Sequence, residues 1–156
     1  MSGREHCYQV SVVWTGNNGA GTSGYKAYER AHVISAPGKA DIPGSSDQSF
    51  RGDASRWNPE DMLVASASTC HMLWYLHLCA VNGVVVLDYR DEAEGAMVEE
   101  ADGSGAFSRI VLRPQIRLSA GSSEQRAREL HHEAHKMCFI ANSLKCQIST
   151  EPAFCR

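Results

Sequence analysis

Apolar residues run almost without interruption from Met62 to Val81, and the residues around this stretch predict one long helix. Asn58 can cap the helix, Pro59 suits its first position, and two carboxylates then meet the positive end of the helix dipole. An Asn-Gly pair after Val81 is a typical helix end. Such a helix spans ~35 Å, and because apolar residues lie on every side of it, we expect a sheet or a second subunit to enclose it.

This stretch also has the length of a membrane span. However, it contains two serines, a threonine and two histidines, and no cluster of Lys or Arg flanks it. We therefore expect a buried helix in a protein that does not contact a membrane. The first residues of the chain hold no apolar stretch, which predicts that there is no secretory signal and that the protein is cytoplasmic.

Residues that favour strands lie on both sides of the long helix. The predicted strands cover residues 7–14, 25–34, 84–88, 89–99, 107–118 and 145–150. The first two should pair as a hairpin, and residues 36–57 should form an irregular surface loop with one short strand at most. A second helix begins at Ser122, with Gln125 completing a capping box, and runs toward Cys138. This order predicts an α+β fold with an antiparallel sheet in a single domain, residues 1–156.

Composition narrows the range of partners. Hydrophobic residues make up 43% and charged residues 21% of the chain, which is typical of a folded globular protein. Fifteen basic and eighteen acidic residues give a net charge of −3, without a basic stripe, so we expect no nucleic-acid partner. A small-molecule site is the default expectation.

The six cysteines include no Cys-x-x-Cys pair, so zinc knuckles and thioredoxin-type motifs are unsupported. In a reducing compartment these cysteines are thiols. Cys70 lies in the middle of the apolar helix, and Cys79 lies on the opposite face, because nine residues at 100° each place it there. Cys138 opens a short turn after the second helix, where a helix dipole should lower the pKa of its thiol.

Residues 58–70, Asn-Pro-Glu-Asp-Met-Leu-Val-Ala-Ser-Ala-Ser-Thr-Cys, resemble the helix signature of the OsmC/Ohr family of thiol-dependent peroxidases. In that family an Asn-Pro-Glu start precedes the peroxidatic cysteine by about ten residues, and a second cysteine follows the second long helix. The resemblance extends from the first strand to Pro152. It implies an OsmC-like fold, with antiparallel sheets wrapped around long central helices in an intertwined homodimer.

The resemblance also implies a reaction. Cys70 would be the peroxidatic thiolate and Cys138 the resolving thiol, so that an organic hydroperoxide is reduced to its alcohol through a Cys70 sulfenic acid and a Cys70–Cys138 disulfide. Glu60 would hold an active-site arginine. The family works without metal, haem or flavin, takes its electrons from small or lipoylated dithiols, and acts in defence against oxidative stress.

The active-site arginine can be placed only by analogy. Ohr-type members carry it in the first hairpin loop, but residues 16–24 contain none. OsmC-type members carry it before the Asn-Pro-Glu start, where both Arg51 and Arg56 lie. We select Arg51, because its glycine-bearing loop could fold over a site. Apolar residues near the two cysteines, Met72, Trp74 and Phe139, favour an alkyl hydroperoxide over hydrogen peroxide.

Two other readings remain open. His131 and His135 are four residues apart on one helix face, which is the spacing of a two-histidine metal chelate, with Cys138 close beyond. The histidines His71 and His77 are also unusual for the family. Alternatively, the protein is a non-enzymatic module that binds a small apolar ligand along the helix. Replacing Cys70 or Cys138 should abolish a peroxidase, whereas replacing His131 or His135 should abolish a metal site.

Overall fold

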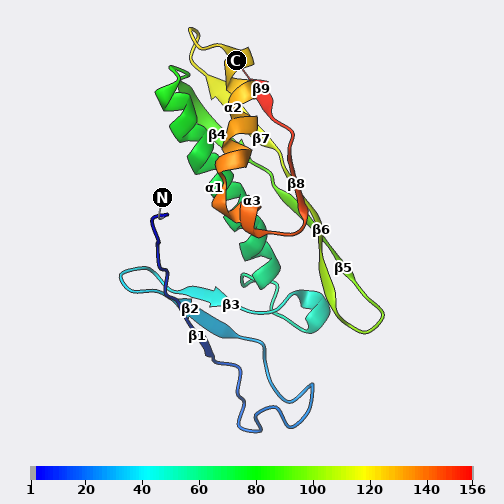
Figure 1. Cartoon of the computed structure of the whole chain (residues 1–156). Coiled ribbons are helices and arrows are strands. Elements are labelled where there is room, and N and C mark those ends of the chain that lie inside the picture. The colour runs from blue at the N-terminus through cyan, green and yellow to red at the C-terminus, as the bar shows by residue number, and fades with distance from the viewer. Residues whose placement is uncertain (1–2, 156) are drawn as a thin grey trace. The chain divides into compact units, whose positions relative to one another are not determined.

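The computed structural model describes residues 3–155, so Met1, Ser2 and Arg156 lie outside it (Figure 1). The chain forms two compact units, Met1–Met62 and Leu63–Arg156. The boundary falls in the first turn of the long helix α1 (Pro59–Val81). Within residues 3–155, none of the helices combines the length and the apolar character needed to cross a membrane.

The first unit contains one antiparallel sheet of three strands. These are β1 (Ser11–Trp14), β2 (His32–Ser35) and β3 (Ile42–Gly44), in the order β1-β2-β3. The predicted hairpin and the short strand of the following loop are confirmed. β2 is shorter than expected because the preceding residues curl around Arg30. Its guanidinium donates to the carbonyls of Tyr25 and Tyr28 and lies 4.4 and 4.2 Å from the centres of their rings.

A turn of 3₁₀ helix, η1 (Gln48–Phe50), orders the loop that follows β3. The Asp47 carboxylate accepts from the amide of Ser49 at 2.7 Å and caps this turn. The next glycine, Gly52, is required, because a β-carbon there would lie 1.6 Å from the carbonyl oxygen of Ser46. The loop is therefore a fixed structure and not an open excursion of the chain.

The long helix α1 begins as the sequence predicts. The side chain of Asn58 accepts from the amide of Asp61 at 2.7 Å, and Pro59 takes the first helical position. One stripe of α1 is buried at every fourth residue: Ala67, His71, Tyr75 and Cys79. Leu73 and Val81 on other sides are exposed, so the chain by itself encloses one face of the helix and not the whole of it.

The second unit contains two sheets of three strands each. Their strands are β4 (Val86–Asp91), β5 (Glu94–Glu99), β6 (Gly105–Leu112), β7 (Pro114–Leu118), β8 (Gln147–Thr150) and β9 (Ala153–Cys155). The orders are β4-β7-β9 and β5-β6-β8. β4 pairs antiparallel with β7, and β5 with β6, whereas β8 and β9 add in parallel to β6 and β7. The α+β class is confirmed, with two parallel pairs in addition to the antiparallel ones.

Each long predicted strand between the helices is divided in two. The break after β4 and the break after β6 lie side by side, because the Asp91 carboxylate accepts from the backbone amide of Arg113 at 2.7 Å. The other oxygen of Asp91 accepts from the hydroxyl of Ser68 on α1 at 2.5 Å. A single half-buried carboxylate therefore joins the helix to the point where one strand pair gives way to the other.

The second helix, α2, covers Glu124–Met137, and a short helix, α3, covers Phe139–Ser143. The predicted cap at Ser122 is wrong by one residue. The Ser123 hydroxyl accepts from the amide of Arg126 at 3.2 Å, while the Ser122 hydroxyl accepts from the amide of Val85 at 2.8 Å. Ser122 thus ties the start of α2 to the segment before β4, and Ser123 caps the helix.

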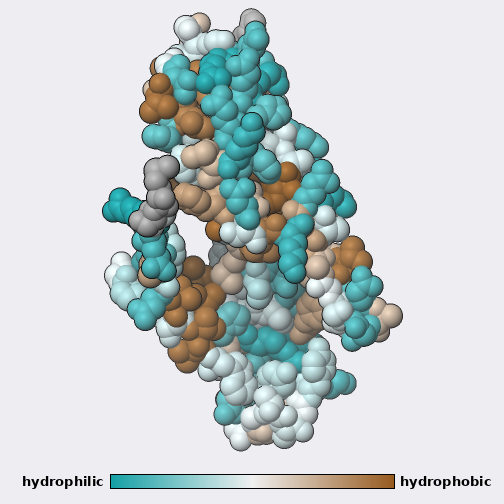
Figure 2. Space-filling view, viewed as in Figure 1, coloured by the Kyte–Doolittle hydropathy of each residue, from teal (hydrophilic) through white to brown (hydrophobic). Residues whose placement is uncertain are grey.

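The core of the second unit consists of two clusters along α1. One packs Tyr75 and Cys79 against Leu130 of α2 and Ile116 of β7. The other packs Ala67 against Ile110 and Leu112 of β6. Gly95 on β5 lets Val64 of α1 pack closely against this sheet, because a β-carbon at Gly95 would lie 2.5 Å from a methyl group of Val64. Other apolar residues are exposed at the surface in several separate places (brown in Figure 2).

Candidate active site

Cys70 and Cys138 come together in the second unit. Cys70 is half-buried in the middle of α1, and Cys138 is buried at the junction of α2 and α3. Cys70 lies close enough to Cys138 to contribute to the raised pKa of the Cys138 thiol. Both are free cysteines, so this is the reduced state of the pair. The chain between them, residues 71–137, forms the rest of α1, the strands β4 to β7 and α2, and the packing of α2 against α1 brings the two cysteines together.

Burial raises the pKa of the Cys138 thiol to about 11. The amide of Ala141 donates to the sulfur at 3.4 Å and opposes this shift, while the neighbouring Cys70 adds to it. The expected lowering of the pKa by a helix dipole is therefore wrong. Cys138 does cap α3, but the helix has only five residues, and the loss of water around the sulfur outweighs its amides.

An aromatic pair flanks the two cysteines. Trp74 lies one turn after Cys70 on α1, and Phe139 follows Cys138 directly. Their rings meet edge to face with centres 5.7 Å apart. A hollow of about 280 Å³ lies beside them, lined by Leu73, Trp74 and His77. The site thus offers an apolar, partly exposed surface next to the thiols, which suits an apolar substrate better than a small polar one.

The residues proposed to assist Cys70 lie in the first unit. Glu60 is half-buried in the first turn of α1. Arg51 ends η1 in the left-handed conformation (φ 64°, ψ 28°), the one non-glycine residue with positive φ among residues 3–155. Arg56 pairs with Asp53 at 3.4 Å. Within the described part of this unit, no ion pair joins Glu60 to Arg51 or Arg56, so the choice between the arginines remains a prediction.

A pair of buried histidines lies between α1 and α2. Nε2 of His71 lies 3.0 Å from Nδ1 of His131, and the two rings are nearly parallel, at 4°. The ring of Tyr75 stacks on that of His131 with centres 3.8 Å apart. The sequence marks both histidines as unusual, but it could not predict that they pair, because 60 residues separate them.

Burial keeps both histidines neutral. It lowers the pKa of His71 to about 4, with a further contribution from His135. It lowers the pKa of His131 to about 3, with further contributions from His71, His132 and Arg128. Each neutral imidazole can donate at one nitrogen and accept at the other. Among residues 3–155, Nδ1 of His71 and Nε2 of His131 find no hydrogen-bond partner.

The metal site that His131 and His135 could form is not assembled. The described residues contain no group of three or more His, Cys, Asp or Glu side chains arranged to hold a metal ion. The reason is that Nδ1 of His131 faces His71 inside the core, whereas His135 lies on the exposed side of α2. The spacing of four residues is present, but Nδ1 of His131 already meets His71, and among the described residues no third ligand joins the two rings.

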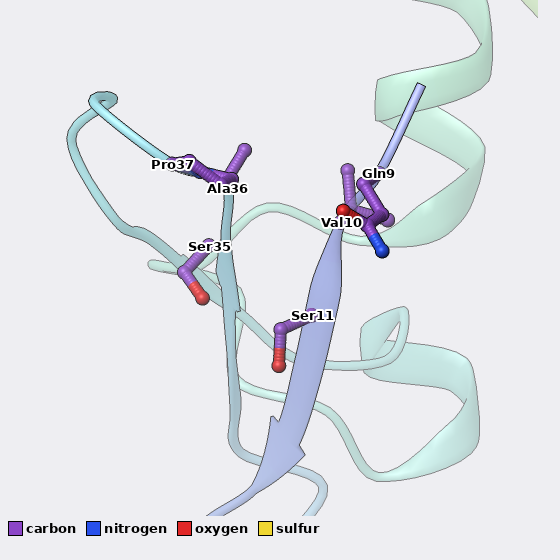
Figure 3. Close-up of a pocket in the computed structure, with 6 residues that line it drawn as sticks. All are labelled: Gln9, Val10, Ser11, Ser35, Ala36 and Pro37. Carbon is purple, nitrogen blue, oxygen red and sulfur yellow. The ribbon is translucent and has the colours of Figure 1, made fainter. Parts of the chain in front are cut away.

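A further hollow, of about 430 Å³, belongs to the first unit (Figure 3). It lies at the start of β1 and the end of β2, where Ser11 and Ser35 are register partners. Its lining residues are Gln9, Val10, Ser11, Ser35, Ala36 and Pro37. None of these carries a charge, an imidazole or a thiol, so this hollow offers no group for acid–base or thiol chemistry.

The fold and the cysteine pair define a protein of the OsmC class, with a thiol pair between two helices. The OsmC-like protein family model matches residues 52–152, which include α1, both cysteines and all strands of the second unit except β9. The chain belongs to this family.

Relatives of known sequence or structure agree with the assignment. The uncharacterized protein YmaD of Bacillus subtilis is 28% identical over 146 residues, 93% of this chain and 85% of that protein. An OsmC-like protein of unknown function from Vibrio cholerae is 30% identical, with a TM-score of 0.86 over 95% of this chain and 99% of that one. An organic hydroperoxide resistance protein from Elizabethkingia anophelis shares the fold, with a TM-score of 0.68 at 16% identity over 97% and 98% of the two chains.

Proposed function

We propose that the protein is a thiol-dependent peroxidase that reduces organic hydroperoxides to alcohols as part of defence against oxidative stress. The proximity of Cys70 to Cys138, near enough for Cys70 to raise the pKa of the Cys138 thiol, is the observation that carries this proposal. The names of family relatives with this fold, which are organic hydroperoxide resistance proteins, point to the same class of substrate.

The reaction has two steps within the protein. The Cys70 thiolate attacks the outer oxygen of the hydroperoxide and the O–O bond breaks, which leaves a sulfenic acid on Cys70 and an alkoxide that takes a proton to become the alcohol. Cys138 then attacks the sulfenic sulfur, and a Cys70–Cys138 disulfide and water result. An external dithiol, small or lipoylated, reduces the disulfide and becomes a disulfide itself.

The raised pKa of Cys138 orders these steps. In the reduced protein Cys138 is almost entirely a thiol at neutral pH, so it does not compete with Cys70 for peroxide. When Cys70 becomes a neutral sulfenic acid, the part of the shift that Cys70 causes is lost. The pKa of Cys138 then falls, and more thiolate is available at the moment when the disulfide must form.

Arg51 and Glu60 are proposed to complete the site, Arg51 by holding the peroxide and stabilising the thiolate, and Glu60 by orienting the guanidinium. Arg51 makes no ion pair within the described residues, so its charge is not already neutralised by a carboxylate. Trp74 and Phe139 would receive the organic part of the substrate.

A steady-state assay tests the proposal. Reduction of cumene hydroperoxide with a dithiol as electron donor should be lost in Cys70→Ser and should persist in Cys155→Ser, because Cys155 lies on β9 outside the site. The ratio of kcat/KM for cumene hydroperoxide to that for hydrogen peroxide should be well above ten. Equal values for the two substrates would remove the argument from the aromatic pair.

A further inference from the structure

The connection between β1 and β2 contains a small cluster of aromatic and guanidinium groups. Trp14, at the end of β1, meets the ring of Tyr28 edge to face with centres 5.8 Å apart, and its indole N–H donates to the carbonyl of Glu29 at 2.8 Å. The guanidinium of Arg30 lies 4.2 Å from the centre of the Tyr28 ring and 4.4 Å from that of the Tyr25 ring. The thiol reaction proposed above uses none of these residues.

Arg30 fixes the place of Tyr25. Its guanidinium donates to the carbonyl of Tyr25 at 2.9 Å and also contacts the ring, so one side chain holds both the backbone and the ring of this residue. The connection is also closed at its base, where the amide of Glu29 donates to the carbonyl of Gly16 at 2.9 Å. Tyr25 is nevertheless 59% exposed. It therefore presents an accessible aromatic ring on an ordered loop.

Arg51 brings a second guanidinium to this ring. Its Cζ lies 5.9 Å from the centre of the Tyr25 ring, at the long end of the cation–π range of about 6 Å. The backbone of Arg51 is fixed at the end of η1, where its amide donates to the carbonyl of Gln48 at 3.1 Å. The side chain is exposed and makes no ion pair within residues 3–155. The ring of Tyr25 thus limits the directions that this long side chain takes.

An aromatic ring suits an arginine that must remain able to bind a substrate. A carboxylate partner would neutralise the charge of Arg51 and occupy two of its N–H donors in a bidentate pair. A tyrosine ring leaves the charge in place and most of the five donors unpaired. The contact also reduces the number of conformations of the side chain, so less entropy is lost when the guanidinium closes on a peroxide.

We propose that Tyr25 is a positioning residue for Arg51. Its ring, held in place by Arg30, keeps the Arg51 guanidinium close to the direction from which it binds the peroxide. This inference rests on the proposed peroxidase function and on the role of Arg51 in it. It adds the connection between β1 and β2 to the parts of the chain that assist the reaction.

Substitutions at Tyr25 test the role of the ring. Tyr25→Leu should lower kcat/KM for cumene hydroperoxide about two- to fivefold, the effect of a cation–π contact at an exposed site. Tyr25→Phe keeps the ring and removes the hydroxyl, so it should retain the wild-type value. Tyr8→Leu, the same change at an exposed tyrosine of the same unit, should retain it as well. The proposal is overturned if Tyr25→Leu is as active as the wild type, or if Tyr25→Phe loses as much activity as Tyr25→Leu.

A double-mutant cycle separates positioning from general damage to the loop. When Arg51→Gly has already removed the guanidinium, Tyr25→Leu should have no further effect on kcat/KM. If Tyr25→Leu lowers kcat/KM by the same factor in the Arg51→Gly background as in the wild type, the ring acts independently of Arg51 and the proposal fails.

Arginine NMR distinguishes a failure of this inference from a failure of the proposed function. The Nε–Hε resonance of Arg51, assigned by its loss in Arg51→Gly, should move in Tyr25→Leu, because the ring current is lost, and should stay nearly in place in Tyr25→Phe. The same pattern is expected in a Cys70→Ser background, which cannot turn over peroxide. An Arg51 resonance that does not respond to Tyr25→Leu overturns the inference even in an active peroxidase. A resonance that responds in a wild type without peroxidase activity overturns the proposed function, and with it the role of the contact in catalysis.

Discussion

Nε2 of His71 on α1 lies 3.0 Å from Nδ1 of His131 on α2, so a hydrogen bond between two neutral histidines connects the two helices inside the core. Both pKa values lie below the ordinary value of 6.5, at about 4 and about 3, because burial disfavours the charged rings. Between these pKa values and 6.5, His71 and His131 are protonated in the unfolded chain but remain neutral in the folded protein.

This difference makes the stability depend on pH. Because the pKa values are lowered in the folded state, the contribution of the pair is fully present above pH 6.5 and is lost as the pH falls toward 4 and 3. The free energy of unfolding should decrease by up to about 2.7 kcal/mol per pH unit in this window, for two protons. Urea unfolding between pH 7.5 and 4.5 measures the slope.

The double variant His71→Phe/His131→Phe isolates the contribution of the pair. It removes both titrating groups and keeps a ring in place to stack on Tyr75, so its slope in this window should be shallower than that of the wild type. His77→Gln, at an exposed histidine of α1, should keep the wild-type slope. Identical slopes in the wild type and the double variant would contradict the burial of neutral histidines.

Asp91 should be among the costlier side chains to remove. Its carboxylate accepts from the Ser68 hydroxyl and from the Arg113 amide, and Asp91→Ala leaves both donors without this acceptor. We expect a loss of about 2–3 kcal/mol in the free energy of unfolding. Asp88→Ala, at an exposed position of the same strand, should cost less than about 0.5 kcal/mol. Denaturant unfolding of the two variants checks this, and equal costs would refute it.

At Arg51 one substitution can distinguish the role of the guanidinium in activity from the role of the backbone conformation in stability. Its left-handed conformation suits glycine, so Arg51→Gly should change the free energy of unfolding by less than about 1 kcal/mol. If the guanidinium acts at the site, the same variant should lose more than tenfold in kcat/KM for cumene hydroperoxide. Arg56→Gln, whose parent pairs with Asp53, should keep most of the activity. The opposite pattern would assign the role to Arg56.

The pKa of Cys138 predicts slow alkylation. At pH 8 about one molecule in a thousand carries the Cys138 thiolate, so iodoacetamide should modify this residue far more slowly than the exposed Cys155. In Cys70→Ala the contribution of Cys70 to the raised pKa is absent, and the pH at which Cys138 reacts should shift downward. Mass spectrometry of the two peptides over a pH series measures both effects, and an unchanged profile would remove the proposed ordering of the two thiols.

Features that depend on neighbours along the chain could be predicted from the sequence. Asn58 and Pro59 specify where α1 begins, and the class of fold follows from the order of elements. The parallel addition of β8 and β9 could not be predicted, because it depends on where α2 and α3 return the chain. The division of the long strands was missed as well, since it rests on the contact of Asp91 with Arg113 across 22 residues.

The candidate site shows the same division. The position of Cys70 on a long helix follows from local pattern, but only the resemblance to the family selected Cys138 among the other cysteines. The raised pKa of Cys138 reverses the expectation from its place at a helix start, because burial depends on the packing of α1 and α2. His71 and His131 were visible as unusual residues, and their contact across the core was not.

A count of free thiols tests the central claim most directly. One equivalent of cumene hydroperoxide is added to the reduced wild type, to Cys70→Ser and to Cys138→Ser, and thiols are titrated before and after. The account predicts rapid loss of two thiols in the wild type, no loss in Cys70→Ser, and a trapped sulfenic acid on Cys70 in Cys138→Ser. No loss of thiols in the wild type, or equal loss in Cys70→Ser, would contradict it.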